Sequence, residues 1–137
     1  MATDCIFCKI IDGTIPSEKV YEDDKVVAIL DINPVTPGHT LVLPREHSKD
    51  FLATPAALLA DVMPRVQAIA AQVMKATKAD GFAMVVFNGP AAGQEVFHLH
   101  VHIIPRKKGD GVRMGWPKTQ YADGEMSKLA QKIRAAR

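Results

Sequence analysis

Three of the chain's five histidines alternate with apolar residues, and this alternation constrains the fold more than any other feature of the sequence. The segment FHLHVHII (97–104) carries His98, His100 and His102 with one apolar residue between each pair. Because side chains two residues apart on a β-strand share a face, the segment predicts a strand with imidazoles on one face and apolar side chains on the other. A row of imidazoles packs poorly and repels itself when charged, so a purely structural role is a poor explanation.

Three chemical interpretations of this row stay open on the residues alone. One is a zinc centre of the catalytic type, in which neighbouring histidines bind one ion. Another is nucleophilic catalysis, in which one imidazole attacks while its neighbours fix its tautomer and handle protons. In the third, one histidine joins Cys5 and Cys8, the only cysteines of the chain, in a separate metal site. That C-x-x-C pair is a redox dithiol or half of a metal site, and the strand that should precede a redox motif is missing.

The rest of the chain predicts strands, one long helix, further strands and a short helix. Stretches rich in β-branched residues indicate a hairpin at 19–32 and single strands at 39–45, 82–87 and 97–104. Thr54 supplies a capping hydroxyl and Pro55 a first helical residue, so a helix begins there and runs to about Lys78. Pro64 should bend or divide this helix. Residues 123–136 carry apolar side chains at helical spacing.

These elements predict an α+β fold, with an antiparallel sheet of about five strands, one long helix and one or two short helices. The length fits a single domain spanning residues 1–137. A formal net charge of +2 is too small to indicate nucleic-acid binding. No apolar run approaches the roughly 20 residues that span a bilayer, and the N-terminus lacks the basic-then-apolar pattern of a secretory signal. We therefore expect a cytoplasmic protein that binds neither nucleic acid nor membrane.

The loop before the histidines, NGPAAGQE (88–95), is rich in small residues. Its two glycines and two alanines let backbone N–H groups approach a ligand closely, and such loops form anion-binding concavities. This signal is weak by itself, because any tight turn is rich in glycine. Next to three histidines it indicates a phosphate held beside an imidazole nucleophile.

Several motifs, in their order along the chain, resemble the histidine triad (HIT) superfamily. The segment HLHVHII (98–104) has the form H-φ-H-φ-H-φ-φ, with φ apolar, which is similar to the signature of that superfamily. The stretch from CIFCKII to LVLPREH (5–47) resembles the N-terminal half of its Hint-like branch. GPAAGQEVFHLHVHIIPR (89–106) resembles the C-terminal signature of that branch, so the resemblance covers nearly the whole chain.

This resemblance implies cleavage at the α-phosphate of purine nucleotides through a covalent nucleotidyl-imidazole intermediate. By its place in the motif, His100 would be the nucleophile. His102 would contact the phosphate and assist the leaving group, and His39 would support both from a neighbouring strand. The resemblance also implies ligand-binding residues at the phosphate, the ribose and the base, which are Asn88, Gly93, Gln94 and Val96, then Asp31, then Ile6, Phe7, Ile10, Ile29 and Ile32.

A structural zinc ion is a further implication of the resemblance. Cys5 and Cys8 are similar to the zinc cysteines of bacterial members, whose remaining ligands correspond to His47 and His98. A Cys₂His₂ set is a closed tetrahedral site with no open position for catalysis. The row of histidines would then do two jobs, with His98 structural and the other two catalytic. Two reduced cysteines without a metal are the alternative.

Two positions depart from the family pattern. Phe87 stands where relatives carry a polar Asn or Gln near the phosphate or ribose, and Asn88 would supply the missing hydrogen bond. Glu95 stands where eukaryotic Hint proteins carry a serine. A carboxylate there repels a phosphate unless it points outward or meets a cationic leaving group. The two departures bear on substrate preference and rate and not on the class of protein.

The sequence thus predicts a nucleotide phosphoramidase or nucleotidyl hydrolase that acts on purine nucleotide conjugates. The alternatives are a dinucleoside polyphosphate hydrolase, a non-catalytic nucleotide-binding or scaffold protein of the same family, and a metallohydrolase with zinc across the histidine row. The resemblance also implies a homodimer that uses the long helix and a sheet edge. In such a dimer the C-terminal segment, with Trp116, would contribute to substrate choice across the interface.

Overall fold

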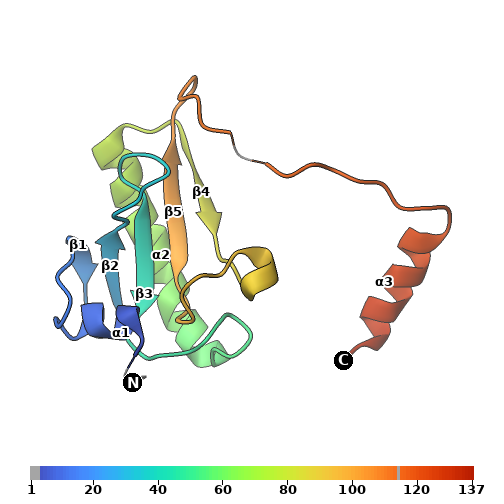
Figure 1. The fold of residues 1–137 in the computed structure, drawn as a ribbon, viewed down its shortest axis with the longest axis horizontal. Helices are drawn as coiled ribbons and strands as arrows, with labels where there is room; N and C mark the ends of the chain where they lie inside the picture. Colours follow the sequence, from blue (N-terminus) through green and yellow to red (C-terminus); the bar gives the residue numbers. More distant parts are fainter. Residues whose placement is uncertain (1–3, 114) are drawn as a thin grey trace.

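The computed structural model describes residues 4–113 and 115–137 and contains a five-stranded antiparallel sheet with the strand order β1-β2-β3-β5-β4 (Figure 1). The sheet and its one long helix confirm the predicted α+β fold. In chain order the elements are α1 (Ile6–Ile11), β1 (Lys19–Glu22), β2 (Val26–Leu30), β3 (Thr40–Pro44), α2 (Ala56–Thr77), β4 (Gly81–Val85), the 3₁₀ turn η1 (Pro90–Ala92), β5 (Val101–Arg106) and α3 (Glu125–Ala135).

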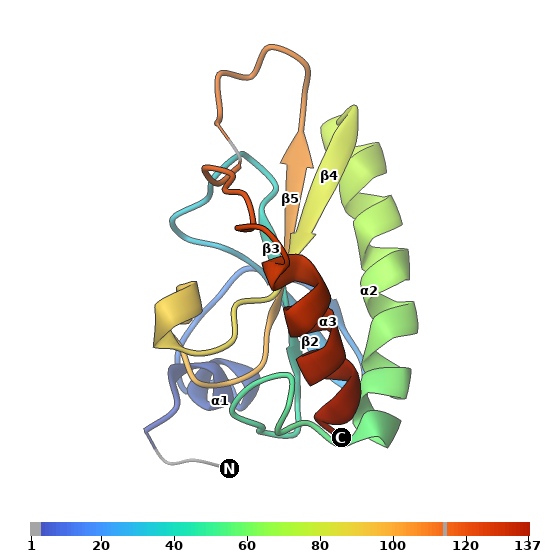
Figure 2. The same ribbon diagram turned by 90° about the vertical axis from the view of Figure 1, so that its right-hand side faces the viewer.

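Helices cover both faces of the sheet, which explains why its central strands are apolar at consecutive positions. In β2, Val26 and Ala28 belong to the core beneath α2, whereas Val27 and Ile29 pack with residues of α1. Figure 2 shows α2 and α1 on opposite sides of the sheet. A strand that is buried on both faces reads as a continuous apolar run and not as an alternating one.

The helix α1 is an element that the sequence analysis does not locate. It has only six residues, too few for a helical period to show. The Cys8 backbone N–H donates to Cys5 Sγ at 3.4 Å and so caps its start. Its apolar residues Phe7, Ile10 and Ile11 are buried against the sheet. This cap uses the same C-x-x-C spacing that suggested a metal site.

The long helix α2 follows the predicted stripe, with Val62, Val66 and Ile69 almost fully buried. Pro64 lies exposed on the opposite face and does not divide the helix. The predicted cap at Thr54 is wrong, because Pro55 occupies the N-cap position without any side-chain cap. The Thr54 hydroxyl instead donates to the Asp50 carbonyl oxygen and bonds the Ser48 hydroxyl, each at 2.6 Å.

The histidine-bearing strand begins later than the sequence predicts. Residues 97–100 lie outside β5, which starts at Val101, so of the three histidines only His102 is on the strand. The Leu99 backbone N–H donates to the Ser48 carbonyl oxygen at 2.8 Å, which takes this stretch out of the sheet ladder. Burial does not alternate along this stretch, since His98 and His100 are buried as well as Leu99 and Val101. Pro105 does not end the strand but pairs with Phe82 of β4.

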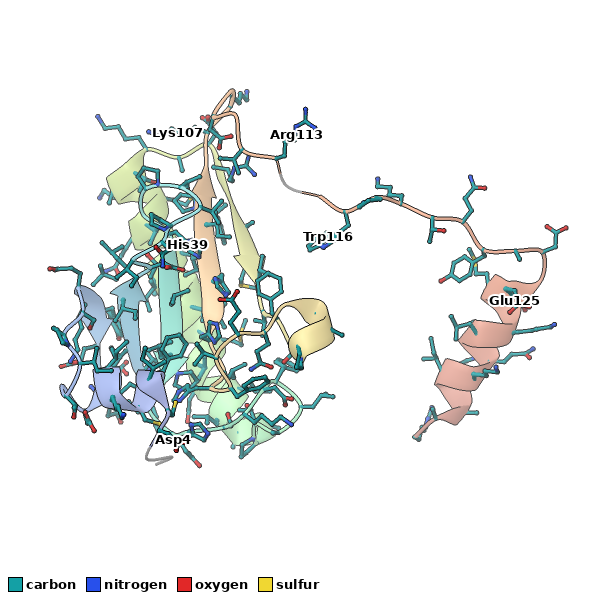
Figure 3. All side chains as sticks on the ribbon, viewed as in Figure 1. Asp4, His39, Lys107, Arg113, Trp116 and Glu125 are labelled. Atoms are coloured by element: carbon teal, nitrogen blue, oxygen red, sulfur yellow. The ribbon has the colours of Figure 1, made fainter. Side chains whose placement is uncertain are left out.

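The C-terminal segment leaves the sheet after β5. Figure 1 shows an extended stretch that carries α3 away from the other elements, and Figure 3 shows Trp116 on that stretch, away from the sheet. The α3 side chains Met126, Leu129 and Ile133 are exposed. Among the described residues no helix is both long enough and apolar enough to cross a membrane.

A glycine beside His39 fits the loop between β2 and β3 against its neighbours. Gly38 has a φ of +94°, a conformation that a side chain strains, and a Cβ there would lie 2.6 Å from Thr77 Cγ2 at the end of α2. The same Cβ would lie 3.3 Å from the Pro105 ring. The next residue, His39, is fixed by its backbone N–H, which donates to the Thr36 carbonyl oxygen at 3.0 Å. Gly38 therefore lets the loop approach both α2 and β5.

We expect Gly38→Ala to lower the free energy of unfolding by about 2–4 kcal/mol, because backbone strain and the clash with Thr77 add. Gly13→Ala is the matched control, since Gly13 has a φ of +86° and nothing within 4 Å of its Cβ position. Gly13→Ala should lower the free energy of unfolding by only about 1 kcal/mol, because it adds backbone strain and no clash. Urea unfolding of both variants measures the difference, and equal losses would contradict the close approach at Gly38.

Candidate functional site

A cavity of about 430 Å³ lies between α1, the end of β2 and the loop that precedes β5. Two of its polar lining residues, His100 and His102, come from the histidine row, and Asp31 stands just after β2. The rest of the lining is mainly apolar, with Ile6, Phe7, Ile10, Ile15, Pro16, Ile29, Leu30, Ile32, Leu41, Phe87 and Val96. A mainly apolar hollow with a few convergent polar groups is typical of a small-molecule site.

A backbone carbonyl fixes the tautomer of His100. Its Nδ1 lies 2.7 Å from the carbonyl oxygen of His98, and because a carbonyl only accepts, Nδ1 carries the proton. The other ring nitrogen, Nε2, therefore keeps a lone pair. Burial lowers the pKa of His100 below its usual value, and the edge of the Phe7 ring packs at 4.8 Å between centroids. His100 is thus a neutral imidazole with one nucleophilic nitrogen.

His39 and His102 form a chain of hydrogen bonds whose direction is also fixed by the backbone. The Val35 N–H donates to His39 Nδ1 at 3.0 Å, so the His39 proton is on Nε2. His39 Nε2 lies 2.9 Å from His102 Nδ1 and donates to it, which leaves His102 with its proton on Nε2. His102 therefore brings an N–H donor to the cavity beside the lone pair of His100.

Burial keeps this pair neutral. It lowers the pKa of His102 to about 4, with smaller contributions from His100 and His39. Burial also lowers the pKa of His39, and the nearby Asp31 carboxylate opposes that shift. Asp31 Oδ2 lies 3.7 Å from His39 Nε2. Near pH 7 the imidazoles therefore add no positive charge to the cavity.

Asp31, His39 and His102 also lie close enough to hold a metal ion, with their ligand atoms within 4.8 Å of one another. The tautomer of His39 argues against a metal ion at these three residues. The His39 Nε2 carries a proton while Val35 donates to Nδ1, so neither nitrogen has a free lone pair. A metal ion there would have to break the bond from Val35. The trio is better described as a proton chain than as a metal site.

The side chain of Gln94, which the resemblance predicts at the phosphate, makes the hydrogen bonds that shape the glycine-rich loop. Gln94 is buried, and its Oε1 accepts from the Gly89 N–H at 2.8 Å. Its Nε2 donates to the carbonyl oxygens of Lys49 and Val96 at 2.8 and 3.0 Å. Gln94 thus fixes the loop so that Gly93 and Val96 line the cavity, and Gln94 itself does not line it.

The structure brings together most of the predicted ligand-binding residues. Asp31, Gly93, Val96 and all five of the predicted base-pocket residues line the cavity. Asn88 does not, because its Oδ1 accepts from the Phe51 N–H at 2.8 Å. His39 reaches the cavity only through His102. The residues missed by sequence reasoning include Ser17, which follows two apolar residues and carries no signal of its own.

The two positions that depart from the family pattern both line the cavity. The rings of Phe87 and His102 pack edge to face, with 5.3 Å between their centroids. The Phe87 ring also lies next to Gly93, since a Cβ on that glycine would be 3.7 Å from Phe87 Cδ1. Phe87 therefore supplies an apolar wall next to the proton donor and no hydrogen bond. Glu95 lies on the loop between Gln94 and Val96 and is exposed.

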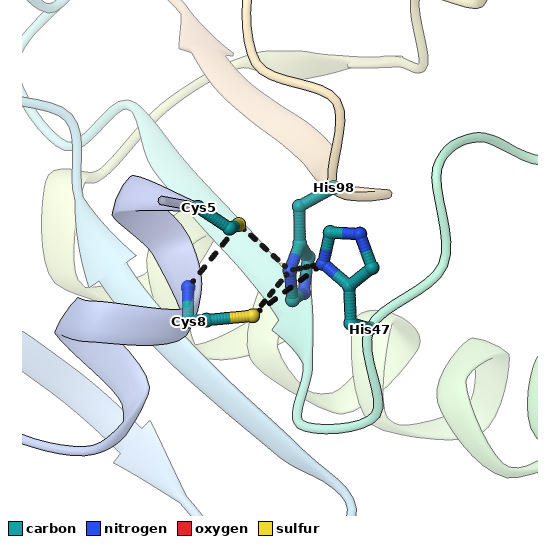
Figure 4. Close-up of side chains that lie close together, drawn as sticks. All are labelled: Cys5, Cys8, His47 and His98. Carbon is teal, nitrogen blue, oxygen red and sulfur yellow. Dashed lines mark hydrogen bonds between the residues drawn. The ribbon is translucent and has the colours of Figure 1, made fainter. Parts of the chain in front are cut away.

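The four predicted metal ligands form a second cluster next to this cavity. Cys5 Sγ, Cys8 Sγ, His47 Nδ1 and His98 Nδ1 lie within 4.8 Å of one another (Figure 4). Tetrahedral zinc with bonds of about 2.0–2.3 Å places its ligand atoms roughly 3.3–3.8 Å apart. Three of the observed separations fall in this range, with 3.5 Å from Cys5 Sγ to His98 Nδ1 and 3.4 and 3.6 Å from Cys8 Sγ to the two imidazoles. The two imidazole nitrogens are slightly closer, at 3.1 Å. The cluster therefore fits a zinc ion in size and in donor type.

The tautomer of His98 suits a metal ligand that binds through Nδ1. Its Nε2 lies 2.8 Å from the carbonyl oxygen of Pro44 and donates to it, so Nδ1 has a lone pair aimed at the two sulfurs. Burial lowers the pKa of His98 to about 4, which keeps the ring neutral as a ligand must be. The predicted split of the histidine row is thus present in the geometry, with His98 in one cluster and His100 and His102 in the other.

Comparisons with known proteins agree with this geometry. A family model described as the HIT domain matches residues 12–109. The adenylylsulfatase HINT3 of Arabidopsis thaliana is 46% identical over 110 residues, which cover 80% of this chain and 56% of that protein. The adenosine 5'-monophosphoramidase HNT1 of Saccharomyces cerevisiae is 39% identical over 132 residues, which cover 96% of this chain and 81% of that protein.

Solved structures of similar chains share the fold. A member of the HIT family from Bacillus subtilis aligns with a TM-score of 0.90 at 39% identity, covering 98% of this chain and 97% of the other. A zinc-bound histidine triad family protein from Mycobacterium smegmatis aligns with a TM-score of 0.78 at 36% identity, covering 98% of this chain and 99% of the other.

We expect the half-buried His102 to make the protein sensitive to acid. Its pKa is about 4 in the folded chain and about 6.5 in the unfolded one, so the unfolded state binds more protons between these values. The contribution of His102 to the free energy of unfolding is therefore fully present above about pH 6.5, and it is lost as the pH falls toward 4. His102→Asn keeps an acceptor for His39 and removes the titration. Between about pH 7.5 and pH 5 it should lose about 1 kcal/mol less stability than wild type, a figure discounted for the partial exposure of the ring.

Urea unfolding at the two pH values, with zinc content matched, measures this difference. The remaining buried histidines are the same in both proteins, so their contributions cancel. Equal pH dependence of the two proteins would mean that His102 is as easily protonated in the folded chain as in the unfolded one.

Proposed function

The chain belongs to the histidine triad (HIT) family, and on that premise we propose that it hydrolyses purine nucleoside phosphoramidates or related conjugates at the α-phosphate. The observation that carries the proposal is the pair of opposite tautomers at the cavity. His100 offers a lone pair on Nε2, and His102 offers a proton on Nε2. A nucleophile beside a proton donor is what substitution at phosphorus needs.

The proposed reaction has two steps. His100 Nε2 attacks phosphorus, an N–P bond forms, and the bond from phosphorus to the leaving amine breaks. The His102 Nε2–H donates a hydrogen bond to the departing nitrogen, which leaves as the amine after taking a proton from solvent. A water then attacks phosphorus, leaves a hydroxyl on the nucleotide, gives its other proton to solvent, and releases His100 with its lone pair restored. The products are a nucleoside monophosphate and an amine.

The other lining residues suit a nucleotide. Apolar side chains such as Phe7 and Ile29 provide flat contact for a purine, and the Asp31 carboxylate can accept from the two ribose hydroxyls. Gly93, with a φ of +101°, turns the loop so that backbone N–H groups near Val96 can face a phosphate. Gln94 supports that loop from behind.

We propose that zinc occupies the cluster of Cys5, Cys8, His47 and His98 as a structural ion. Four protein ligands fill a tetrahedral shell, so the ion would supply cross-linking between α1, the segment after β3 and the segment before β5, and no chemistry at phosphorus. The similar zinc-bound protein from Mycobacterium smegmatis supports this assignment. A catalytic zinc across the histidine row fits less well, because His98 faces away from the cavity into this cluster.

We also propose that the protein is a cytoplasmic homodimer. The support is an apolar surface made by the outer face of α2 and the edge strand β4, where Met63, Phe82 and Met84 are exposed. These residues line a shallow hollow together with Pro64 and Ala70. Exposed apolar surface of this kind marks a contact with another chain.

Brief incubation with an adenosine phosphoramidate should add the mass of one adenylyl group to wild type and not to His100→Ala. Removing the nucleophile should also lower kcat/KM by at least about 10³-fold. Intact-protein mass spectrometry and product release measure the two effects. If a folded wild-type protein binds the nucleotide but forms no adduct and releases no product, the protein is a non-catalytic binder.

Wild type should contain about one zinc ion per chain, and Cys8→Ser should contain less than about a fifth of that. Since metal binding adds to folding stability, the variant should melt at least about 5 °C lower. A chelator should lower the melting temperature of wild type and leave that of Cys8→Ser unchanged, which separates loss of metal from loss of packing. Equal zinc contents in the two proteins would contradict the assignment.

A further inference from the structure

Glu95 lines the cavity but has no role in the proposed reaction. It lines the cavity beside His100 and His102, and it also lines a second, adjoining hollow together with Asp4 and His47. Its side chain is exposed and makes no hydrogen bond or ion pair with any residue in the described part of the chain. Nothing in the fold therefore requires a carboxylate at this position.

The charge of the two hollows is one-sided. Among the described residues, the cavity is lined by the carboxylates of Asp31 and Glu95 and by no lysine or arginine. The adjoining hollow, described from the same residues, likewise has no lysine or arginine in its lining. A ligand with several negative charges would thus meet a negative wall, and a ligand that carries its own cation would meet an attractive one.

The place of Glu95 indicates which part of a ligand it would face. If the proposed function holds, the nucleoside occupies the apolar part of the cavity, with its ribose at Asp31 and its phosphate between His100 and the loop. The remaining substituent on phosphorus is the leaving group. Glu95 neighbours Val96 on that loop and connects the cavity to the second hollow, so it borders the space left for this group.

From this placement we infer that Glu95 selects the leaving group. This inference rests on the proposed function and adds a substrate class to it. The preferred substrates are purine nucleoside phosphoramidates whose leaving amine carries a second, cationic amine. Conjugates with an anionic leaving group, including further phosphates, are disfavoured by the same carboxylate. The bonds made and broken are those of the proposed reaction, and Glu95 takes no part in them.

The test compares three adenosine 5'-phosphoramidates with leaving amines of similar length. Ethylenediamine carries a cation, propylamine is neutral, and β-alanine carries a carboxylate. For wild type we expect kcat/KM to be about fivefold higher for the cationic than for the neutral compound, a size typical of one exposed charge pair. The anionic compound should be disfavoured by a similar factor. The preference should shrink when the ionic strength is raised from about 0.02 M to about 0.5 M, because salt screens exposed charges.

Glu95→Gln removes the charge and keeps the shape of the side chain. In this variant the ratio of cationic to neutral kcat/KM should fall to about one. Glu22→Gln is the matched control, because it removes the same charge from the end of β1, where the residue lines neither hollow, and it should keep the wild-type ratio.

The outcomes separate this inference from the proposed function. If wild type cleaves all three compounds with equal kcat/KM, or if Glu95→Gln keeps the wild-type preference, Glu95 does not select the leaving group while the proposed function stands. If wild type cleaves none of the three, the proposed function fails and this inference fails with it. A preference that is lost in Glu95→Gln and kept in Glu22→Gln supports both.

Discussion

The hydrogen bonds of one residue, His98, connect the two clusters on which the rest of this site depends. Its Nε2–H donates to the Pro44 carbonyl oxygen at the end of β3, which directs Nδ1 toward the two cysteines. Its own carbonyl oxygen accepts from His100 Nδ1, which leaves the lone pair of His100 on Nε2. The orientation of the Cys₂His₂ cluster and the tautomer of the proposed nucleophile are therefore set by the side chain and the carbonyl group of one buried residue.

Burial supplies the second condition, which is neutrality. The imidazoles lie on the face of the sheet that α1 covers, and transfer from water disfavours their charged forms. Each buried ring then needs a partner for every nitrogen that does not face the ligand. The backbone provides these partners at Val35, Pro44 and His98. Because backbone groups do not titrate, the tautomers they fix persist over the range of pH in which the fold is stable.

The sequence predicted the parts of this arrangement that follow from short-range spacing. The alternation around His100 separates imidazoles from core residues, and the stripe through Val62 and Ile69 makes α2. What it could not show depends on contacts across the chain. The start of β5 at Val101 is set by a bond from Leu99 to Ser48, fifty-one residues away. Likewise, the amide of Gln94 is occupied by Gly89, Lys49 and Val96, a set of partners with no common pattern in the sequence.

These features together explain how a cavity with negative walls could hold the phosphate of the proposed substrate. Since Asp31 and Glu95 are its charged groups and the imidazoles are neutral, the attraction would come from dipoles, namely backbone N–H groups near Val96 and the Nε2–H of His102, because the N–H groups of Gly93 and Gln94 already donate within the loop. Dipoles favour one phosphate in one orientation and do little for a chain of phosphates, which would place its extra charges near Glu95. In the proposed reaction the same dipoles would act on the charge that develops at phosphorus, and because the backbone and Gln94 hold the loop in place, they would not need to reorganise as that charge appears.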